Sequence, residues 1–205
     1  MKINCISIYT FMIFLLYAGI GTLCTGCKSK SSHSESSHDH EHVSSDNNAQ
    51  KASSQPLSLP SETHGNIGKL HISIQYTAPA VRGRIIWGGL VPYDNIWVTG
   101  AHNATQVTFN NTVMIGGQSI DKGKYAFFTI PGTDEWTIIL NKNWNQHQAD
   151  DYNTDEDVVR VKVKSDIVDN MQERLQYTIE DIDGTNGNIT VHWEKLKVSL
   201  PLQVL

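Results

Sequence analysis

Short segments that alternate apolar and polar residues recur between Leu59 and Leu205, and they limit the possible folds more than any other feature. The clearest examples cover residues 70–76, 106–109 and 158–164. A period of two places the apolar side chains on one face of a strand, which is typical of half-buried β-strands. No stretch has the apolar spacing of a long amphipathic helix. The pattern therefore predicts an all-β domain.

Five further segments are apolar and rich in β-branched or aromatic residues, namely 125–130, 136–140, 176–180, 189–193 and 197–205. Turn-forming pairs such as Gly116-Gly117 and Asn186-Gly187 separate many of these segments. Residues 167–174 could form one helical turn at most. About nine or ten short strands joined by turns predict a single antiparallel β-sandwich of jelly-roll type.

The first 26 residues have the composition of a lipoprotein signal peptide. One positive charge at Lys2 precedes an uncharged apolar core, and the small residues Thr25 and Gly26 lie directly before Cys27. We predict cleavage before Cys27 and attachment of two or three acyl chains, palmitate among them, to this residue. More than one chain is what stable membrane anchoring requires.

Two alternatives to this processing remain open. Residues 6–23 form an 18-residue apolar run, at the lower edge of what a membrane-spanning helix needs. Cys24 could itself be modified, although Leu23 is too bulky for the position before a cleaved cysteine. Because Lys28 rather than Asp follows Cys27, there is no simple inner-membrane retention signal. We expect a bacterial cell-envelope protein anchored by lipid in the outer membrane, at the periplasm.

Residues 27–58 are predicted to form a disordered Ser- and His-rich tether, because their apolar content is too low to bury a core. His38, His40 and His42 alternate with acidic residues in this segment. Imidazole and carboxylate groups together suit Zn²⁺ or Cu²⁺. A solvated linker is the simpler interpretation, and weak metal binding at the tether is the alternative. No other cofactor is expected.

Residues 59–205 form the predicted β-sandwich domain, which is long enough for one sizeable core. All three cysteines (Cys5, Cys24 and Cys27) precede it, so the domain has no disulfide and no thiol chemistry. Cleavage removes only one cation, Lys2, and leaves 15 Lys and Arg against 21 Asp and Glu, a formal charge of −6. This charge and the scattered basic residues argue against nucleic-acid binding.

One long segment carries a recognisable pattern. Gly83-Arg84-Ile85-Ile86-Trp87-Gly88-Gly89-Leu90-Val91-Pro92-Tyr93 is followed by Trp97-Val98-Thr99-Gly100-Ala101. This string resembles the domain of unknown function 2911 family, found in secreted and lipid-anchored bacterial proteins, and the resemblance covers roughly residues 59–193. It implies a fold and a habitat but no reaction.

The chain departs from the family pattern at two positions. Ala78 and Val98 stand where the family usually has arginine. Both changes remove a cation that we expect at the surface. Any anion site that the family builds on those two arginines is therefore not expected in this chain.

The same segment supplies the candidate ligand-binding residues, which combine cations, aromatic rings and polar loop side chains. They are Arg82, Arg84, Trp87, Tyr93, Trp97, Thr99, His102 and Asn103. A guanidinium group can clamp a carboxylate, a phosphate or sugar hydroxyls, and aromatic rings can stack on a sugar or another planar ligand. The structural alternatives are an arginine bonded to loop carbonyls or to Asp94, and aromatic rings that close one end of the sandwich.

These residues favour a non-catalytic module that binds a small molecule or glycan. An enzyme of the hydrolase type, with His102 as the base, is an alternative. No acid–base partner for His102 can be named from the sequence, and such chemistry needs a positioned one. A structural partner in an envelope complex is the third possibility. The ligand and the oligomeric state stay open.

Overall fold

The computed structural model describes residues 56–205, and within this range the fold is all-β and antiparallel. The expected all-β class and the strand number are confirmed, whereas the jelly-roll connectivity stays a prediction. The predicted signal peptide, Cys27 and the histidines of the predicted tether lie outside the described residues. Within residues 56–205, no helix is long and apolar enough to cross a bilayer.

Nine strands form one hydrogen-bonded series in the order β1-β2-β3-β6-β7-β8-β9-β4-β5. Their bounds are β1 Ser58–Ile67, β2 Leu70–Pro79, β3 Gln106–Phe109, β4 Val113–Ile115, β5 Gln118–Ile120, β6 Gly123–Ile130, β7 Glu135–Asn141, β8 Asp157–Asp181 and β9 Asn186–Val204. A short 3₁₀ turn, Thr154–Glu156, precedes β8.

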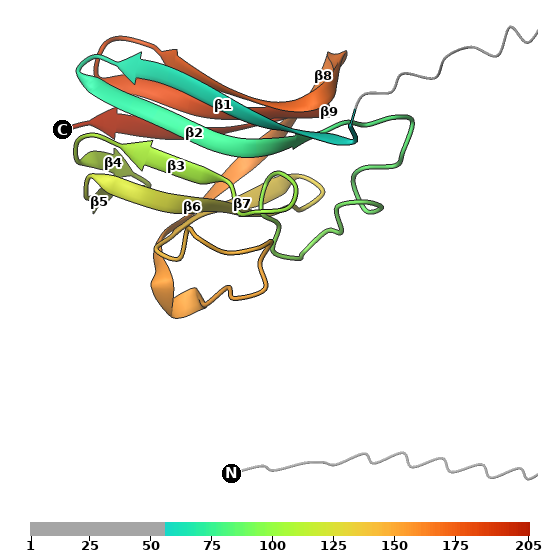
Figure 1. The fold of residues 1–205 in the computed structure, drawn as a ribbon. Coiled ribbons are helices and arrows are strands. Elements are labelled where there is room, and N and C mark those ends of the chain that lie inside the picture. Colours follow the sequence, from blue (N-terminus) through green and yellow to red (C-terminus); the bar gives the residue numbers. More distant parts are fainter. Residues whose placement is uncertain (1–55) are drawn as a thin grey trace, which may run out of the picture. The chain divides into compact units, whose positions relative to one another are not determined.

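Strand β8 belongs to both halves of this series. Its first part pairs with β7 and its second part pairs with β9, with register shifts between Ile167 and Gln176. Figure 1 shows the consequence: β1, β2 and β9 lie above β3, β6 and β7, so the series folds over on itself. Contacts between Tyr76 and Tyr177, whose rings are 4.7 Å apart, join β2 to the second part of β8.

The interior between these layers holds the main core. In β2, Leu70, Ile72 and Ile74 are buried, as the period of two predicts, and His71 and Gln75 between them are exposed. The largest fully buried side chains are Trp136, Trp193, Tyr177, Phe109, Phe127 and Phe128. The two tryptophans come from strands almost sixty residues apart, so the core ties the two halves of the series together.

Three local predictions were wrong or incomplete. Residues 167–174 continue β8 rather than forming a helical turn, and β-bulges there let the strand bend between its two partners. The segments 189–193 and 197–205 belong to one strand, β9, in which Glu194 has a positive φ of 56°. Strand β1 was not predicted, because its sequence contains Pro60 and Gly65, residues that weaken a strand signal but are tolerated at a sheet edge.

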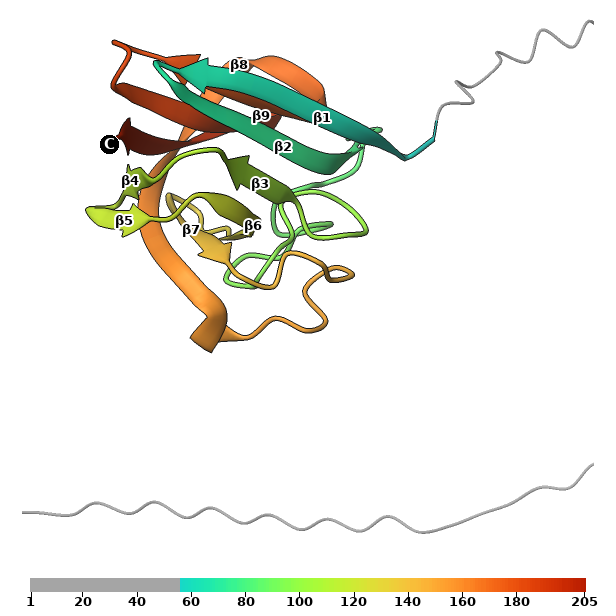
Figure 2. The same ribbon diagram turned by 60° about the vertical axis from the view of Figure 1, so that its left-hand side comes forward.

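Strands β6 and β7 are covered on their second face as well. A smaller buried cluster there contains Val98, Ala104, Phe128 and Ile139. Two long connections supply the cover, residues 80–105 between β2 and β3 and residues 142–153 between β7 and β8. Figures 1 and 2 show the first connection at the end of the domain at which the described chain begins, and Figure 1 shows the second connection below β6 and β7. The segment that carries the family pattern is therefore packed against the sheet.

Candidate functional site

A pocket of about 290 Å³ opens at this end of the domain, and three of the eight predicted ligand-binding residues line it. They are Arg84, Trp97 and His102. The remaining wall is largely apolar, with Leu90 and Trp193 among its members. A small volume with an apolar wall and few polar groups is typical of a small-molecule site.

The backbone of its own loop holds Arg84 in place. The Nε of Arg84 donates to the carbonyl of Val81 at 3.2 Å, and its Nη2 donates to the carbonyl of Ala80. Carbonyl oxygens carry no net charge, so these bonds orient the guanidinium without neutralising it. The structural alternative considered from the sequence, an arginine bonded to loop carbonyls, is therefore present. The charged guanidinium of Arg84 still lines the pocket. An oriented guanidinium favours a carboxylate or phosphate group.

Four tryptophans from three parts of the chain form the floor behind the pocket. Trp97 stacks on Trp193 with ring centroids 5.9 Å apart and planes at 22°, and both line the pocket. Trp87 packs edge-on against both of these rings, and Trp136 packs edge-on against Trp97 and Trp87. The Nε1 of Trp97 donates to the carbonyl of Gly100 at 3.1 Å, which fixes the indole in its loop. The stacked pair gives the pocket a rigid aromatic wall.

The backbone around the pocket is strained. The described non-glycine residues with positive φ are Arg82, Asp94, Thr99, His102, Gln148 and Glu194. His102 and Gln148 line the pocket, and Thr99 and Glu194 are each next in sequence to a lining residue. Such conformations cost roughly 1–3 kcal/mol each and cluster at functional sites. The amide of Gln148 donates to the carbonyl of His102 at 2.6 Å and locks the two strained loops together.

Four other candidate residues lie outside the pocket. Arg82 is exposed nearby, and its amide donates to Glu173 Oε1 at 2.9 Å. Tyr93 is half-buried in the same loop. Thr99 is fully buried, where its hydroxyl donates to Thr129 Oγ1 at 3.0 Å and its carbonyl accepts from Tyr177 Oη at 2.8 Å. Trp87 contributes to the aromatic floor, and its Nε1 is buried with no partner among the described residues.

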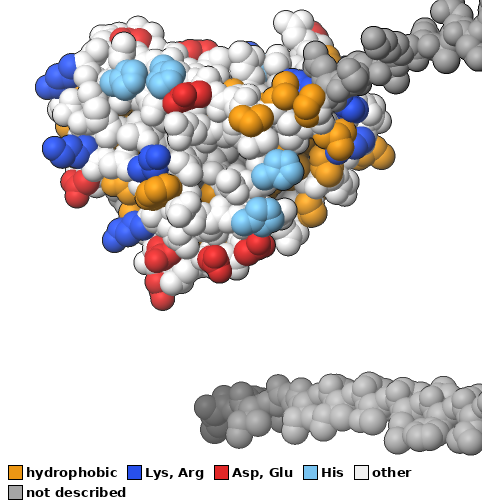
Figure 3. Space-filling view, in the orientation of Figure 1, with side chains coloured by type: hydrophobic (Ala, Val, Ile, Leu, Met, Phe, Trp, Pro, Cys, Tyr) orange, Lys and Arg blue, Asp and Glu red, His pale blue; other side chains and the backbone are white. Residues whose placement is uncertain are grey.

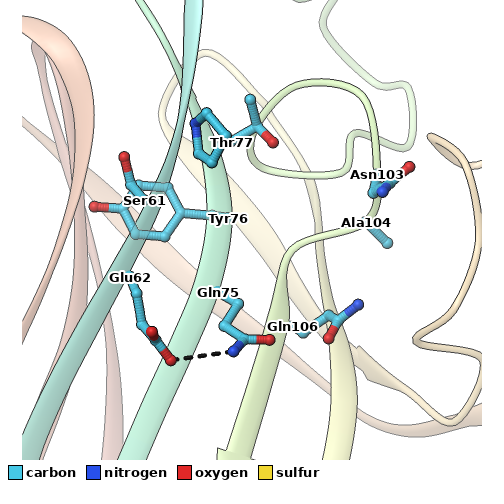
Figure 4. A pocket seen from close by; sticks show the side chains of 9 residues that line it. Ser61, Glu62, Gln75, Tyr76, Thr77, Asn103, Ala104 and Gln106 are labelled. Atoms are coloured by element: carbon cyan, nitrogen blue, oxygen red, sulfur yellow. Dashed lines mark hydrogen bonds between the residues drawn. The ribbon is translucent and has the colours of Figure 1, made fainter.

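Asn103 lines a second, more polar hollow of about 450 Å³ on the other side of the same loop. Figure 4 shows this groove, in which Glu62 and Gln75 from β1 and β2 lie near Asn103 and Gln106. The Nε2 of Gln75 donates to Glu62 Oε1 at 3.1 Å. Tyr76 also lines the groove, and Figure 4 shows its ring on the side of Ser61, away from Asn103 and Gln106.

The sequence of the domain has a family assignment. Residues 58–202 match the family described as "Protein of unknown function (DUF2911)". The chain belongs to this family. Searches of curated proteins and of solved structures found no match.

The two departures of this DUF2911 domain from the family pattern bear on the pocket. Ala78 and Val98 are 3% and 5% exposed, so the expectation that these positions lie on the surface was wrong. Val98 lines the pocket directly, next to Trp97. An arginine at position 98 would bring a charged group to this wall, whereas valine keeps it apolar. In this DUF2911 domain, Arg84 is the one guanidinium that lines the pocket.

Several residues of the pocket had no signal in the sequence. Trp193 lies in β9, and Gln148 lies in the connection before β8, far along the chain from the family pattern. In the sequence, Trp193 has the pattern of an ordinary core residue in an alternating strand. Only the folding of the sheet places its ring against that of Trp97. Ser58 was assigned to the tether and lies at the start of β1.

The described lining of the pocket contains a histidine but no carboxylate partner for it. No Asp or Glu is among its lining residues in the described part of the chain. His147 precedes the pocket residue Gln148 in the sequence. Its ring pairs with Asp150 instead, with Nδ1 of His147 2.9 Å from Oδ2 of Asp150. Proton transfer by a histidine needs a positioned partner, and none faces His102 across this space.

Proposed function

We propose that this protein is a non-catalytic binding module of the bacterial cell envelope, anchored by lipid at Cys27. Its ligand is a small molecule with a planar or ring-shaped part and an anionic group, and the pocket of Arg84, Trp97 and His102 receives it. The tryptophan wall contacts the ring and the guanidinium contacts the anion.

One observation carries the proposal: Arg84 and His102 line the same pocket, and none of its described lining residues is an Asp or a Glu. A hydrolase that used His102 as a base would require an acidic or metal partner at this point. A binding site requires only donors, an apolar wall and a fixed shape. The strained loops on either side support the same conclusion, because strain persists where the surrounding structure holds a functional conformation.

A second candidate is a glycan ligand, favoured by the polar groove beside Asn103. Planar amide and carboxylate groups such as those of Gln75, Gln106 and Glu62 can pair with adjacent sugar hydroxyls. The loop that contains His102 and Asn103 separates this groove from the pocket, so a larger ligand could contact both.

A thermal-shift screen tests the proposal. The library contains aromatic and aliphatic carboxylates, phosphates and mono- to oligosaccharides. A ligand at one hundred times its Kd should add about 2.7 kcal/mol to the unfolding free energy and raise the Tm. We expect Arg84→Ala to weaken binding of the anionic hits by tenfold or more, since a charge-assisted hydrogen bond contributes about 1.5–3 kcal/mol.

The matched variants are His102→Asn and His147→Asn. Asparagine tolerates the positive φ of residue 102 better than alanine, so the fold is preserved. The change at His102 should reduce affinity, whereas the same change at exposed His147 should not. A hit that binds the wild type and the Arg84 and His102 variants equally would place the site elsewhere, and conversion of a hit to product would establish an enzyme.

A further inference from the structure

The end of the domain that carries the pocket also has an exposed apolar and basic surface, here called the basic tip. Its apolar members are Leu57, Ile85 and Leu90, which are 56%, 79% and 47% exposed. Large aliphatic side chains at this exposure have no role in the core. Figure 3 shows hydrophobic and basic side chains side by side at the right-hand end of the molecule, where the described chain begins.

Hydrogen bonds show that the basic tip is one continuous surface. The amide of Ala80 donates to the carbonyl of Leu57 at 3.0 Å, and Arg84 donates to the carbonyl of Ala80. The Nη2 of Arg174 donates to the carbonyl of Pro56 at 2.9 Å. The amide of Leu90 donates to the carbonyl of Ile85 at 3.0 Å. Segments far apart in the sequence therefore meet at this end.

The arginines of the chain are concentrated at this surface. The chain has an excess of acidic residues, yet three of its four arginines, Arg82, Arg84 and Arg174, lie at the basic tip. Glu173 lies beside them and accepts from the amide of Arg82. A cluster of cations on an acidic domain is complementary to a negatively charged surface.

We propose that the basic tip docks on an anionic lipid bilayer. Exposed aliphatic side chains beside arginines are what interfacial membrane binding needs, with the chains entering the headgroup region and the cations facing lipid phosphates. The inference rests in part on the proposed lipid anchor, because the segment with Cys27 leads into the domain at this same end. Docking would place the mouth of the pocket close to the membrane surface.

Vesicle binding of the unlipidated domain tests the inference. The fragment is residues 56–205, which contain the whole described core. Sedimentation with vesicles of phosphatidylglycerol and phosphatidylethanolamine in a 3:7 ratio is compared with vesicles of neutral phosphatidylcholine. Binding should be several-fold stronger to the anionic vesicles and should fall as salt rises. Arg82→Gln should weaken it about fivefold, the loss expected for one basic residue at such a surface.

Matched variants locate the contact. Ile85→Ser with Leu90→Ser should reduce binding by more than tenfold, since about 0.8 kcal/mol is lost per buried CH₂. Ile182→Ser, at the β8–β9 turn and 63% exposed, and Lys122→Gln, before β6, should leave it unchanged. On wild-type protein, a paramagnetic headgroup lipid should broaden the amide signals of Leu57, Ile85 and Leu90 first.

Three results would overturn the inference: equal binding to neutral and anionic vesicles, broadening at another face, or a dimer that the Ile85 and Leu90 changes dissociate without any vesicle binding. The last would show that the basic tip binds a second copy of the chain. Because the fragment has no lipid and the assay contains no pocket ligand, each of these failures leaves the proposed function standing.

Discussion

At the scale of single residues, the pocket depends on side chains whose backbones are held in unfavourable conformations. Thr99 is the clearest case, because a β-branched residue with φ of 51° is a conformational outlier. Its burial, the bond from its hydroxyl to Thr129 and the bond from Tyr177 to its carbonyl maintain that conformation. Thr99 therefore supports the loop that carries Trp97 and His102, and it is not among the residues that line the pocket.

His192 provides a residue-scale prediction about pH. Burial, and then the charge of Lys197, lower the pKa of its imidazole below the usual 6.5. As pH falls through 6.5, the unfolded chain takes up a proton that the folded chain does not, so the free energy of unfolding decreases with falling pH. We expect His192→Gln to flatten this part of the curve, measured by urea unfolding in steps below pH 7.

If His192→Gln unfolds with the same pH dependence as wild type, the imidazole is not held neutral in the fold. An NMR titration of the His192 ring signals in folded protein provides the independent check, with a midpoint below 6.5 expected.

At the scale of elements, two hairpin turns from opposite ends of the sequence lock together. Gly68 in the β1–β2 turn faces Gly184 in the β8–β9 turn, and both have positive φ. The carboxylate of Asp181 accepts from the amide of Gly68 at 2.9 Å and from that of Gly184 at 2.6 Å. These backbone hydrogen bonds lower the pKa of the Asp181 carboxyl. One acidic side chain thus links the two turns.

The glycine pair gives a matched stability prediction. A Cβ on Gly68 would meet the carbonyl oxygen of Gly184, whereas a Cβ on Gly184 would meet nothing nearby. Gly184→Ala should cost about 1–2 kcal/mol of unfolding free energy for its positive φ alone. Gly68→Ala should cost roughly 1–3 kcal/mol more, because backbone must also move. Chemical denaturation measures both, and equal losses would show that the close approach of the turns is not maintained.

The strands show how much of the fold the sequence could predict. The alternation of apolar and polar residues identified β2 and β3. The pair Gly116-Gly117 identified a turn, and both glycines have positive φ in the β4–β5 hairpin. Periodicity did not reveal that β8 and β9 are long and bulged, because a bulge shifts the alternation and divides one strand into two apparent ones. Strand β1 depends on pairing with β2 rather than on its own pattern.

The candidate site was predictable only where it is local in sequence. The segment from Arg84 to His102 attracted interest through its arginine and aromatic content, and it does contribute to the pocket. Trp193 and Gln148 join it through the packing of β9 and of the connection before β8. Such contacts depend on the path of the whole sheet, which the residue pattern of one segment does not contain.

At the scale of the whole molecule, the features proposed to bind a ligand or a membrane are concentrated at one end of the domain. The pocket, the strained loops, three arginines and three exposed aliphatic residues all lie where the described chain begins. The opposite end, with the turns at Gly68 and Gly184, is bonded internally. This polarity fits a domain that is anchored and docked on one side and stabilised on the other.

The most direct test of the central claim follows the tryptophan indole N–H signals of ¹⁵N-labelled protein while the strongest hit from the thermal-shift screen is added. Trp97 and Trp193 line the pocket, whereas Trp144 lies next to the polar groove, where its carbonyl accepts from Gln106 at 3.3 Å. We predict saturable shifts at Trp97 and Trp193, little change at Trp144 and an unaltered ligand spectrum after incubation. Shifts confined to Trp144, or the appearance of a product, would contradict a non-catalytic site at this pocket.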